Sequence, residues 1–203
     1  MALGARVGGG GRRRRPAPEP PSDRPTADDP PADPESAART VCLNLLTARS
    51  RSRAELAGEL ARRDVADDVA ETVLDRLVEV GLLDDAAFAE QWVHSRHRHR
   101  GLGRRALADE LRRKGVDRPT ATAALDELGR DDERARADEL VRRRLPSLAR
   151  FDTTTATRRL VGMLARKGYD AGIAHDVVRA ALADRGSDDD AVPSAFDLGD
   201  TGP

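Results

Sequence analysis

One pattern recurs three times along the chain and constrains its fold more than any other feature. Two leucines stand four residues apart in each copy, and the copies are Leu56 and Leu60, Leu107 and Leu111, and Leu160 and Leu164. Residues four apart share one face of a helix, so each pair marks the apolar stripe of a helix. A period of roughly 50 residues is typical of tandem helical repeats.

A turn signal follows each leucine pair. The three turns read Arg62-Arg63-Asp64-Val65, Arg113-Lys114-Gly115-Val116 and Arg166-Lys167-Gly168-Tyr169. Each middle helix therefore ends in basic residues and a tight turn, where glycine can adopt the left-handed conformation. A closing helix follows each turn, with Leu74, Leu125 and Val178 in corresponding positions. Each unit is therefore expected to contain three helices.

The composition sets the limits of these units. We expect repeats at about 36–82, 83–129 and 131–184, between a tail at 1–35 rich in Arg, Pro and Gly and an acidic tail at 185–203. Segments with so few apolar residues cannot offset their conformational entropy, so both tails are expected to be disordered. The predicted fold is all-α: an elongated row of three tandem three-helix, helix-turn-helix-like repeats.

Local signals predict where several helices begin and end. Ser52 and Glu55 have the spacing of a capping box, in which a hydroxyl and a carboxylate bind the first backbone N–H groups. Asp84 and Asp117 are expected to cap the helices that follow them, and Asp67 likewise. The run of threonines at 153–155 offers another N-cap, and Pro146 is expected to end or kink the helix before it.

The cysteine content and hydropathy indicate the compartment. Cys42 is the single cysteine and lies on an apolar stripe, so it cannot form an internal disulfide and a reducing cytoplasm is expected. No apolar run approaches the ~20 residues that span a bilayer. Arg12 to Arg15 are followed by Pro16, where a signal peptide would need an apolar segment. We therefore expect a cytoplasmic protein that does not enter membranes.

The centre of the chain is strongly basic although the formal net charge is only -1. The candidate partner- or DNA-binding residues are Arg96, Arg98, Arg100, Arg104, Arg105, Arg112, Arg113 and Lys114. Arginine binds phosphate or carboxylate through a planar fork, so this surface suits a nucleic-acid backbone or an acidic protein surface. Aromatic residues make up only 2% of the chain, which argues against base-specific reading of single strands.

The sequence gives little support to catalysis or metal binding. It has no Gly-rich phosphate loop, no G-x-S-x-G and no evident Cys/His pair, so we predict no enzyme activity, no catalytic residue and no cofactor. His94, His97 and His99 could suggest a metal site. They lack a nearby cysteine, however, and the arginines between them would repel a cation, so no metal is expected.

Two functions of different classes fit helix-turn-helix-like units. A DNA-binding transcription factor is one, but its recognition helix needs Arg, Asn or Gln toward the major groove. The closing helices here read DDVAETVLDRLVEV and DRPTATAALDEL and are acidic or neutral. A scaffold for another partner is a further possibility.

The stretch GLLDDAAFAEQWVHSRHRHRGLGRRALADELRRKGV at 81–116 resembles the central signature of the RecX family, regulators of the RecA recombinase. The segments SRAELAGELARRDVADDVAETVLDRLVEVGLLDD before it and TRRLVGMLARKGYDAGIAHDVV after it support the resemblance, which covers roughly 36–184.

The resemblance implies a helical-repeat regulator of homologous recombination, DNA repair and the SOS response. Such a protein binds the RecA filament on single-stranded DNA and inhibits filament growth, ATP hydrolysis and strand exchange. We expect it to act as a monomer, with possible contacts to single- or double-stranded DNA through phosphates. The family supplies no catalytic residues and no compact binding motif, so the eight basic residues are a physical prediction.

Overall fold

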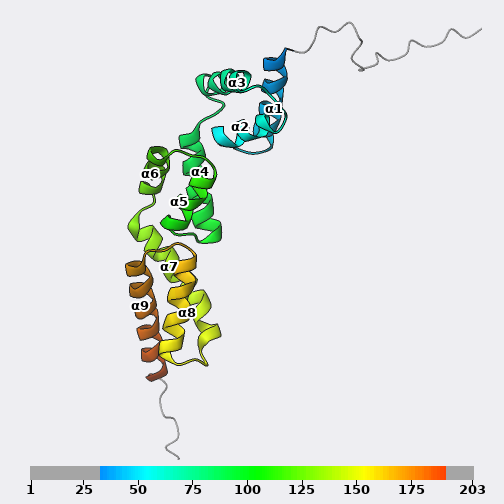
Figure 1. Cartoon of the computed structure of the whole chain (residues 1–203). Helices are drawn as coiled ribbons and strands as arrows, with labels where there is room; N and C mark the ends of the chain where they lie inside the picture. The colour runs from blue at the N-terminus through cyan, green and yellow to red at the C-terminus, as the bar shows by residue number, and fades with distance from the viewer. Residues whose placement is uncertain (1–32, 191–203) are drawn as a thin grey trace, which may run out of the picture. The chain divides into compact units, whose positions relative to one another are not determined.

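The computed structural model describes residues 33–190, and this part of the chain consists of nine α-helices and one short 3-10 helix, with no strand. The first three helices are α1 (Pro34–Ala48), α2 (Arg53–Ala61) and α3 (Asp67–Glu79). They are followed by α4 (Asp85–Arg100), α5 (Arg104–Arg113) and α6 (Arg118–Asp126). The last group is α7 (Arg130–Arg144), η1 (Leu145–Leu148), α8 (Thr153–Arg166) and α9 (Ala171–Asp190). The all-α fold with three three-helix repeats in tandem is confirmed (Figure 1).

Each repeat closes an apolar core of its own. Leu56 and Leu60 of α2 pack with Cys42 and Leu74 in the first repeat. The equivalent leucines of α5 pack with Phe88 and Leu125, and those of α8 with Tyr169 and Val178. All six repeated leucines are fully buried. The spacing that defines the repeat in the sequence is therefore the spacing of the central core side chains.

Most of the predicted helix ends are confirmed. Ser52 and Glu55 form a complete capping box at the start of α2. Asp84 caps α4 through the backbone N–H groups of Ala86 and Ala87, and Asp117 caps α6 through that of Thr120. Gly115 has a φ of 73°, the left-handed conformation expected at the end of α5. The helix before Pro146 ends at Arg144 and continues as the 3-10 turn η1.

Two predicted caps are wrong. Asp67 is the first residue of α3, and Ala66 stands at the N-cap without a side-chain hydrogen bond. An acid in the first turn still interacts favourably with the helix dipole, which explains the aspartates there. At α8 the cap is Asp152, whose side chain accepts from the backbone N–H of Thr155. Asp152 lies one residue before the threonine run that was expected to cap this helix.

Helical structure extends slightly past the predicted repeat limits at both ends. Asp33 caps α1 and Pro34 fits its first turn, where a missing N–H costs nothing. At the other end α9 continues to Asp190. Adding a residue to a formed helix gains one hydrogen bond for each residue that is ordered, which costs less than starting a helix. A helix can therefore extend beyond the apolar stripe on which it forms. The predicted tails otherwise lie outside the described residues.

Candidate functional site

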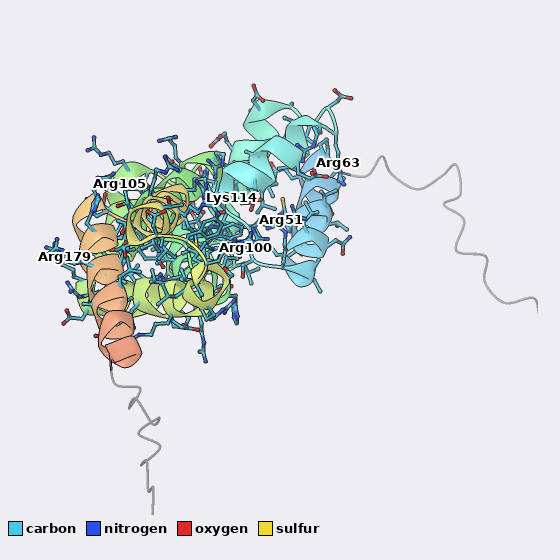
Figure 2. The ribbon with its side chains drawn as sticks, turned by 90° about the horizontal axis from the view of Figure 1, so that it is seen from below. Arg51, Arg63, Arg100, Arg105, Lys114 and Arg179 are labelled. Carbon is cyan, nitrogen blue, oxygen red and sulfur yellow. The ribbon has the colours of Figure 1, made fainter. Side chains whose placement is uncertain are left out.

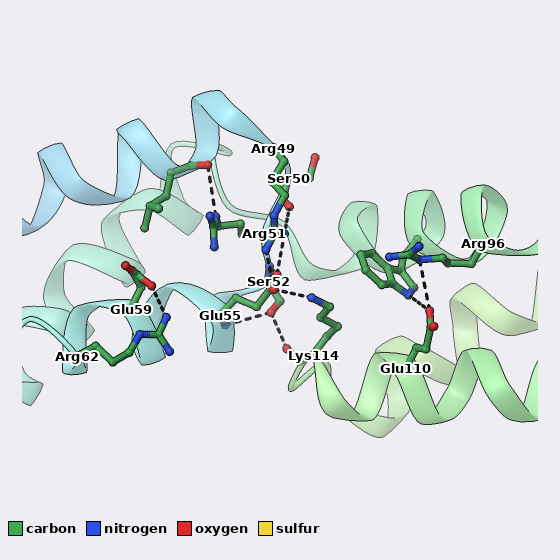
Figure 3. Close-up of polar contacts among 12 residues, drawn as sticks. Arg49, Ser50, Arg51, Ser52, Glu55, Glu59, Arg62, Arg96, Glu110 and Lys114 are labelled. Atoms are coloured by element: carbon green, nitrogen blue, oxygen red, sulfur yellow. Dashed lines mark hydrogen bonds and ion pairs between the residues drawn. The ribbon is translucent and has the colours of Figure 1, made fainter. Parts of the chain in front are cut away.

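The basic centre begins at a junction where the last turn of α5 meets the first turn of α2. The hydroxyl of Ser52 donates to the carbonyl of Lys114 over 2.6 Å, and the ammonium of Lys114 donates to Glu55 over 2.6 Å (Figure 3). Arg49 binds the same Glu55 carboxylate at 3.0 Å. Two cations from different repeats therefore share one carboxylate, and Lys114 serves the junction between repeats.

The Glu55 carboxylate is held in its charged form. Burial raises its pKa, but the hydrogen bonds and charges of Arg49 and Lys114 outweigh this and bring the pKa to about 2. Its side chain is only 17% exposed. The ion pairs therefore stabilise the junction most when Glu55, Arg49 and Lys114 are all charged.

Trp92 of α4 packs beside this junction and holds two of the predicted basic residues. The guanidinium carbon of Arg96 lies 4.1 Å from the centre of the indole ring, and the Lys114 nitrogen lies 4.7 Å from it (Figure 3). The indole N–H donates to Glu110 over 2.8 Å, and Arg96 approaches the same carboxylate at 3.4 Å. Arg96 is therefore engaged inside the second repeat by a cation–π contact and an ion pair.

A second junction joins the last turn of α8 to the first turn of α5. The N–H of Gly103 donates to the carbonyl of Lys167 over 2.8 Å, and the N–H of Arg105 donates to that of Gly168 over 3.1 Å. The ammonium of Lys167 in turn reaches the carbonyl of Arg100 at 2.6 Å. Burial, with the charges of Arg136 and Arg143, lowers the pKa of Lys167.

Both junctions follow one plan. In each, the carbonyl end of one middle helix meets the N–H end of the middle helix before it, which places opposite ends of two helix dipoles together. An acid from the next opening helix also accepts the first N–H: Asp85 binds that of Arg53 at 2.8 Å, and Glu133 binds that of Arg104 at 3.0 Å. Each middle helix is therefore completed by residues of the following repeat.

Two predicted site residues at the start of α5 also have side-chain partners. The guanidinium of Arg104 donates to the carbonyl of Leu128 over 3.1 Å and to the carboxylate of Asp126. Arg105 is 70% exposed, lies at the periphery of the chain in Figure 2, and pairs with Asp170 at 3.0 Å. The side chain of Arg104 thus contributes to packing within the second repeat, whereas Arg105 pairs with the third repeat and has its charge partly neutralised at the surface.

The remaining predicted residues are exposed. Arg112 pairs with Asp109 at 3.0 Å, three residues earlier on the same helix. Arg98, Arg100 and Arg113 have exposed side chains and no ion pair within residues 33–190. At about 100° per residue, Arg98 and Arg100 stand on different sides of α4. The eight residues therefore divide into two at the junctions (Lys114 and Arg105), three with partners inside the second repeat (Arg96, Arg104 and Arg112) and three with no ion pair in the described part of the chain.

The histidines of α4 have separate surroundings. His97 is buried, and its Nδ1 donates to the carbonyl of Leu102 over 2.8 Å, while His94 and His99 are exposed. Within residues 33–190 no cluster of His, Cys, Asp and Glu has the arrangement of a metal site. No helix in the same span is long and apolar enough to cross a membrane.

Comparison with models of protein families shows which family the chain belongs to. The model of the first three-helix domain of RecX matches residues 38–77, that of the second matches 84–125 and that of the third matches 131–178. The chain belongs to the RecX family. Its RecX relatives include the regulatory protein RecX of Thermobifida fusca, which is 53% identical over 156 residues. That match covers 77% of this chain and 84% of the relative.

Other RecX proteins agree in sequence and in fold. The regulatory protein RecX of Mycolicibacterium smegmatis is 52% identical over 170 residues, which cover 80% of this chain and 90% of the relative. The crystal structure of RecX from Lactobacillus salivarius superimposes with a TM-score of 0.71 at 20% identity. It covers 75% of this chain and 99% of the solved one, so the three-helix repeats persist where most of the sequence has changed.

Sequence reasoning missed the acids that hold the junctions. Glu55 was expected only as part of a capping box, and Glu133 was not singled out, although it is 3% exposed and binds the first N–H of α5. One signal could have found it. Asp85 is the first residue of α4 and Glu133 is the fourth residue of α7, so an acid in the first turns of each opening helix is the signal that they share.

Proposed function

We propose that this chain is a non-enzymatic regulator of the RecA recombinase that acts in the cytoplasm as a monomer. It binds the recombinase filament on single-stranded DNA and restrains filament growth, ATP hydrolysis and strand exchange. Membership of the RecX family, with all three of its domains present in order, carries this proposal.

The free cations are the residues that we assign to the contact. Arg98, Arg100 and Arg113 expose guanidinium groups that no acid of residues 33–190 neutralises. A guanidinium fork binds a carboxylate of the recombinase or a phosphate of its DNA equally well in geometry. Arg105 and Arg112 contribute less, because each already has a carboxylate within 3.0 Å.

The other basic residues determine how these cations are presented. Lys114, Arg96 and Arg104 fix neighbouring helices through buried or half-buried contacts, and this keeps the exposed arginines at set positions in their repeats. A binder with preset positions loses less conformational entropy on association. Bound in this way, the chain restrains the filament by blocking subunit addition or by favouring subunit loss.

Co-sedimentation with RecA filaments on single-stranded DNA tests the assignment. Replacing Arg98, Arg100 and Arg113 together with glutamine removes three free cations without touching a junction. We expect binding to weaken by at least roughly tenfold, because hydrogen bonds to charged groups contribute about 1.5–3 kcal/mol each. The matched control replaces Arg39, Arg118 and Arg130, which are also exposed and without ion pairs within residues 33–190.

Each outcome has a clear meaning. Weaker binding of the first variant, with the control close to the parent, supports a contact at the basic centre. Equal binding by all three proteins would show that these arginines are not the contact. Tight binding to one duplex sequence without recombinase would instead favour a transcription factor built on helix-turn-helix-like units.

A further inference from the structure

The third repeat carries a cluster of arginines that the proposed function does not use. An open hollow of about 500 Å³ is lined by Arg144 from the end of α7 and by Arg158, Arg159 and Arg166 of α8, with Leu148 and Met163 between them. All four arginines are exposed. No carboxylate lines the hollow.

The missing carboxylate partners distinguish this cluster from its surroundings. Arg142, also near the end of α7, binds Asp138 at 2.7 Å and Asp184 at 3.0 Å. None of the four arginines of the hollow has an ion pair within residues 33–190. Asp152, the acid nearest in sequence to Arg158 and Arg159, accepts from the N–H of Thr155 as the cap of α8. Glu139 and Asp170, the acids nearest in sequence to Arg144 and Arg166, pair with Arg136 and Arg105. Like charges gathered without counter-charges repel one another, and a bound anion relieves that repulsion.

An aromatic ring lies next to the cluster. Phe151 is half-buried, and the guanidinium carbons of Arg159 and Arg150 lie 3.9 Å and 4.9 Å from its ring centre. A guanidinium stacked on a ring is held flat, so its remaining edge can donate to a phosphate. A nucleic-acid base can also stack on the flat face of a guanidinium or of an aromatic ring.

The length of the cluster fits a strand better than a single anion. Arg158 and Arg166 are eight residues apart on α8, which is about 12 Å at 1.5 Å per residue. A nucleic-acid strand in helical form advances about 3.4 Å per phosphate, so roughly three phosphates fall within this distance. The apolar side chains of Leu148 and Met163 also line the hollow. They would not interact favourably with a carboxylate, but they can contact sugars and bases.

We propose that the hollow formed by Arg144, Arg158, Arg159 and Arg166 is a binding site for the sugar–phosphate backbone of single-stranded DNA. The site lies in the third repeat and is separate from the basic centre of the second. The inference deepens the proposed function, since a filament on single-stranded DNA brings such a strand close to the chain. The test needs no recombinase, so its failure would leave the regulator proposal standing.

Fluorescence anisotropy of a labelled oligothymidylate, titrated over a salt series, tests the site. Replacing Arg158 and Arg166 with glutamine is expected to weaken binding by roughly tenfold. The slope of log K against log salt is expected to fall by about 1.4, because each single-strand phosphate contact contributes about 0.7. The control replaces Arg118 and Arg130 with glutamine, which removes the same charge from exposed positions outside the hollow.

The control and a second anion make the result decisive. A control variant that binds like the parent, next to a weakened R158Q/R166Q protein of equal helix content, supports the site. Equal losses in both variants would mean general attraction to positive charge and overturn it. Labelled polyglutamate that binds as tightly as the oligonucleotide, and is lost in R158Q/R166Q, would assign the hollow to an acidic protein instead.

A charge-preserving variant covers the case in which glutamine disturbs α8. R158K/R166K keeps both charges but not the guanidinium forks. We expect it to retain the salt slope of the parent and most of its affinity, because lysine also binds phosphate as a point charge. A slope that falls with lysine in place would contradict a direct phosphate contact.

Discussion

The carboxylate of Glu55 binds three groups from two repeats, namely the backbone N–H of Ser52 and the side chains of Arg49 and Lys114. It completes the capping box of α2, binds Arg49 at 3.0 Å and accepts from Lys114 of the next repeat at 2.6 Å. The folded chain therefore favours the charged carboxylate more than the unfolded chain does. Any change that discharges Glu55 weakens a helix start and a junction at once.

This arrangement predicts a specific dependence of stability on pH. The pKa of Glu55 falls from an ordinary value of 4.5 to about 2 in the folded chain, so between these values the unfolded state binds more protons. Its contribution is complete above pH 4.5 and is lost as the pH falls toward 2. We expect Glu55→Gln to lower the free energy of unfolding by about 2 kcal/mol at pH 7.

Urea denaturation at several pH values measures this effect. The difference between the parent and Glu55→Gln is expected to shrink steadily below pH 4.5. Glu79→Gln is the control, because Glu79 is 63% exposed and pairs with an Arg76 that is 68% exposed. A surface pair of this kind contributes less than about 1 kcal/mol. A Glu55 difference that stays constant down to pH 2 would contradict the assignment.

At the scale of helices, small residues let the junctions form. A Cβ on Gly103 would lie 2.8 Å from the backbone of Gly168 and Tyr169, and one on Gly168 would overlap the backbone of Ala106. Gly168 also has a φ of 84°, in the left-handed region. The end of α8 can approach the start of α5 this closely only because neither position carries a side chain.

Gly168→Ala is therefore predicted to be costly for two separable reasons. We expect it to lower the free energy of unfolding by more than about 2 kcal/mol, from left-handed strain together with overlap. Gly81→Ala isolates the strain, about 1 kcal/mol, since Gly81 has a φ of 72° and open space around it. Gly58→Ala, inside α2 and also in open space, should gain about 0.5–1 kcal/mol.

Thermal and urea unfolding of the three variants separate these contributions. The expected order of stability is Gly58→Ala, then the parent, then Gly81→Ala, then Gly168→Ala. Equal losses at Gly81 and Gly168 would show that the close approach of α8 to α5 adds nothing beyond backbone strain.

The helices were predictable from sequence because their signals are local. The Leu56–Leu60 spacing, the Ser52–Glu55 box and the left-handed Gly115 each depend on residues within a turn or two. The junctions were not predictable, because they pair residues such as Ser52 and Lys114 that are 62 positions apart. The eight basic residues looked alike in the sequence, and only their partners show that Lys114 and Arg104 serve packing while Arg98 and Arg113 stay free.

For the whole molecule, the central claim is that these repeats regulate a recombinase. The three repeats each have a core, and the first two also depend on the repeat that follows them to complete a helix start. Membership of the RecX family gives this arrangement its proposed partner. We propose that the free cations of the basic centre are the groups that contact that partner.

The most direct measurement is DNA-dependent ATP hydrolysis by the cognate RecA on single-stranded DNA, titrated with this chain. The proposal predicts a fall in the rate at well below one chain per recombinase subunit, and a weaker fall with the Arg98, Arg100 and Arg113 variant. An unchanged rate, with the chain folded and helical by circular dichroism, would contradict the claim that it restrains the filament.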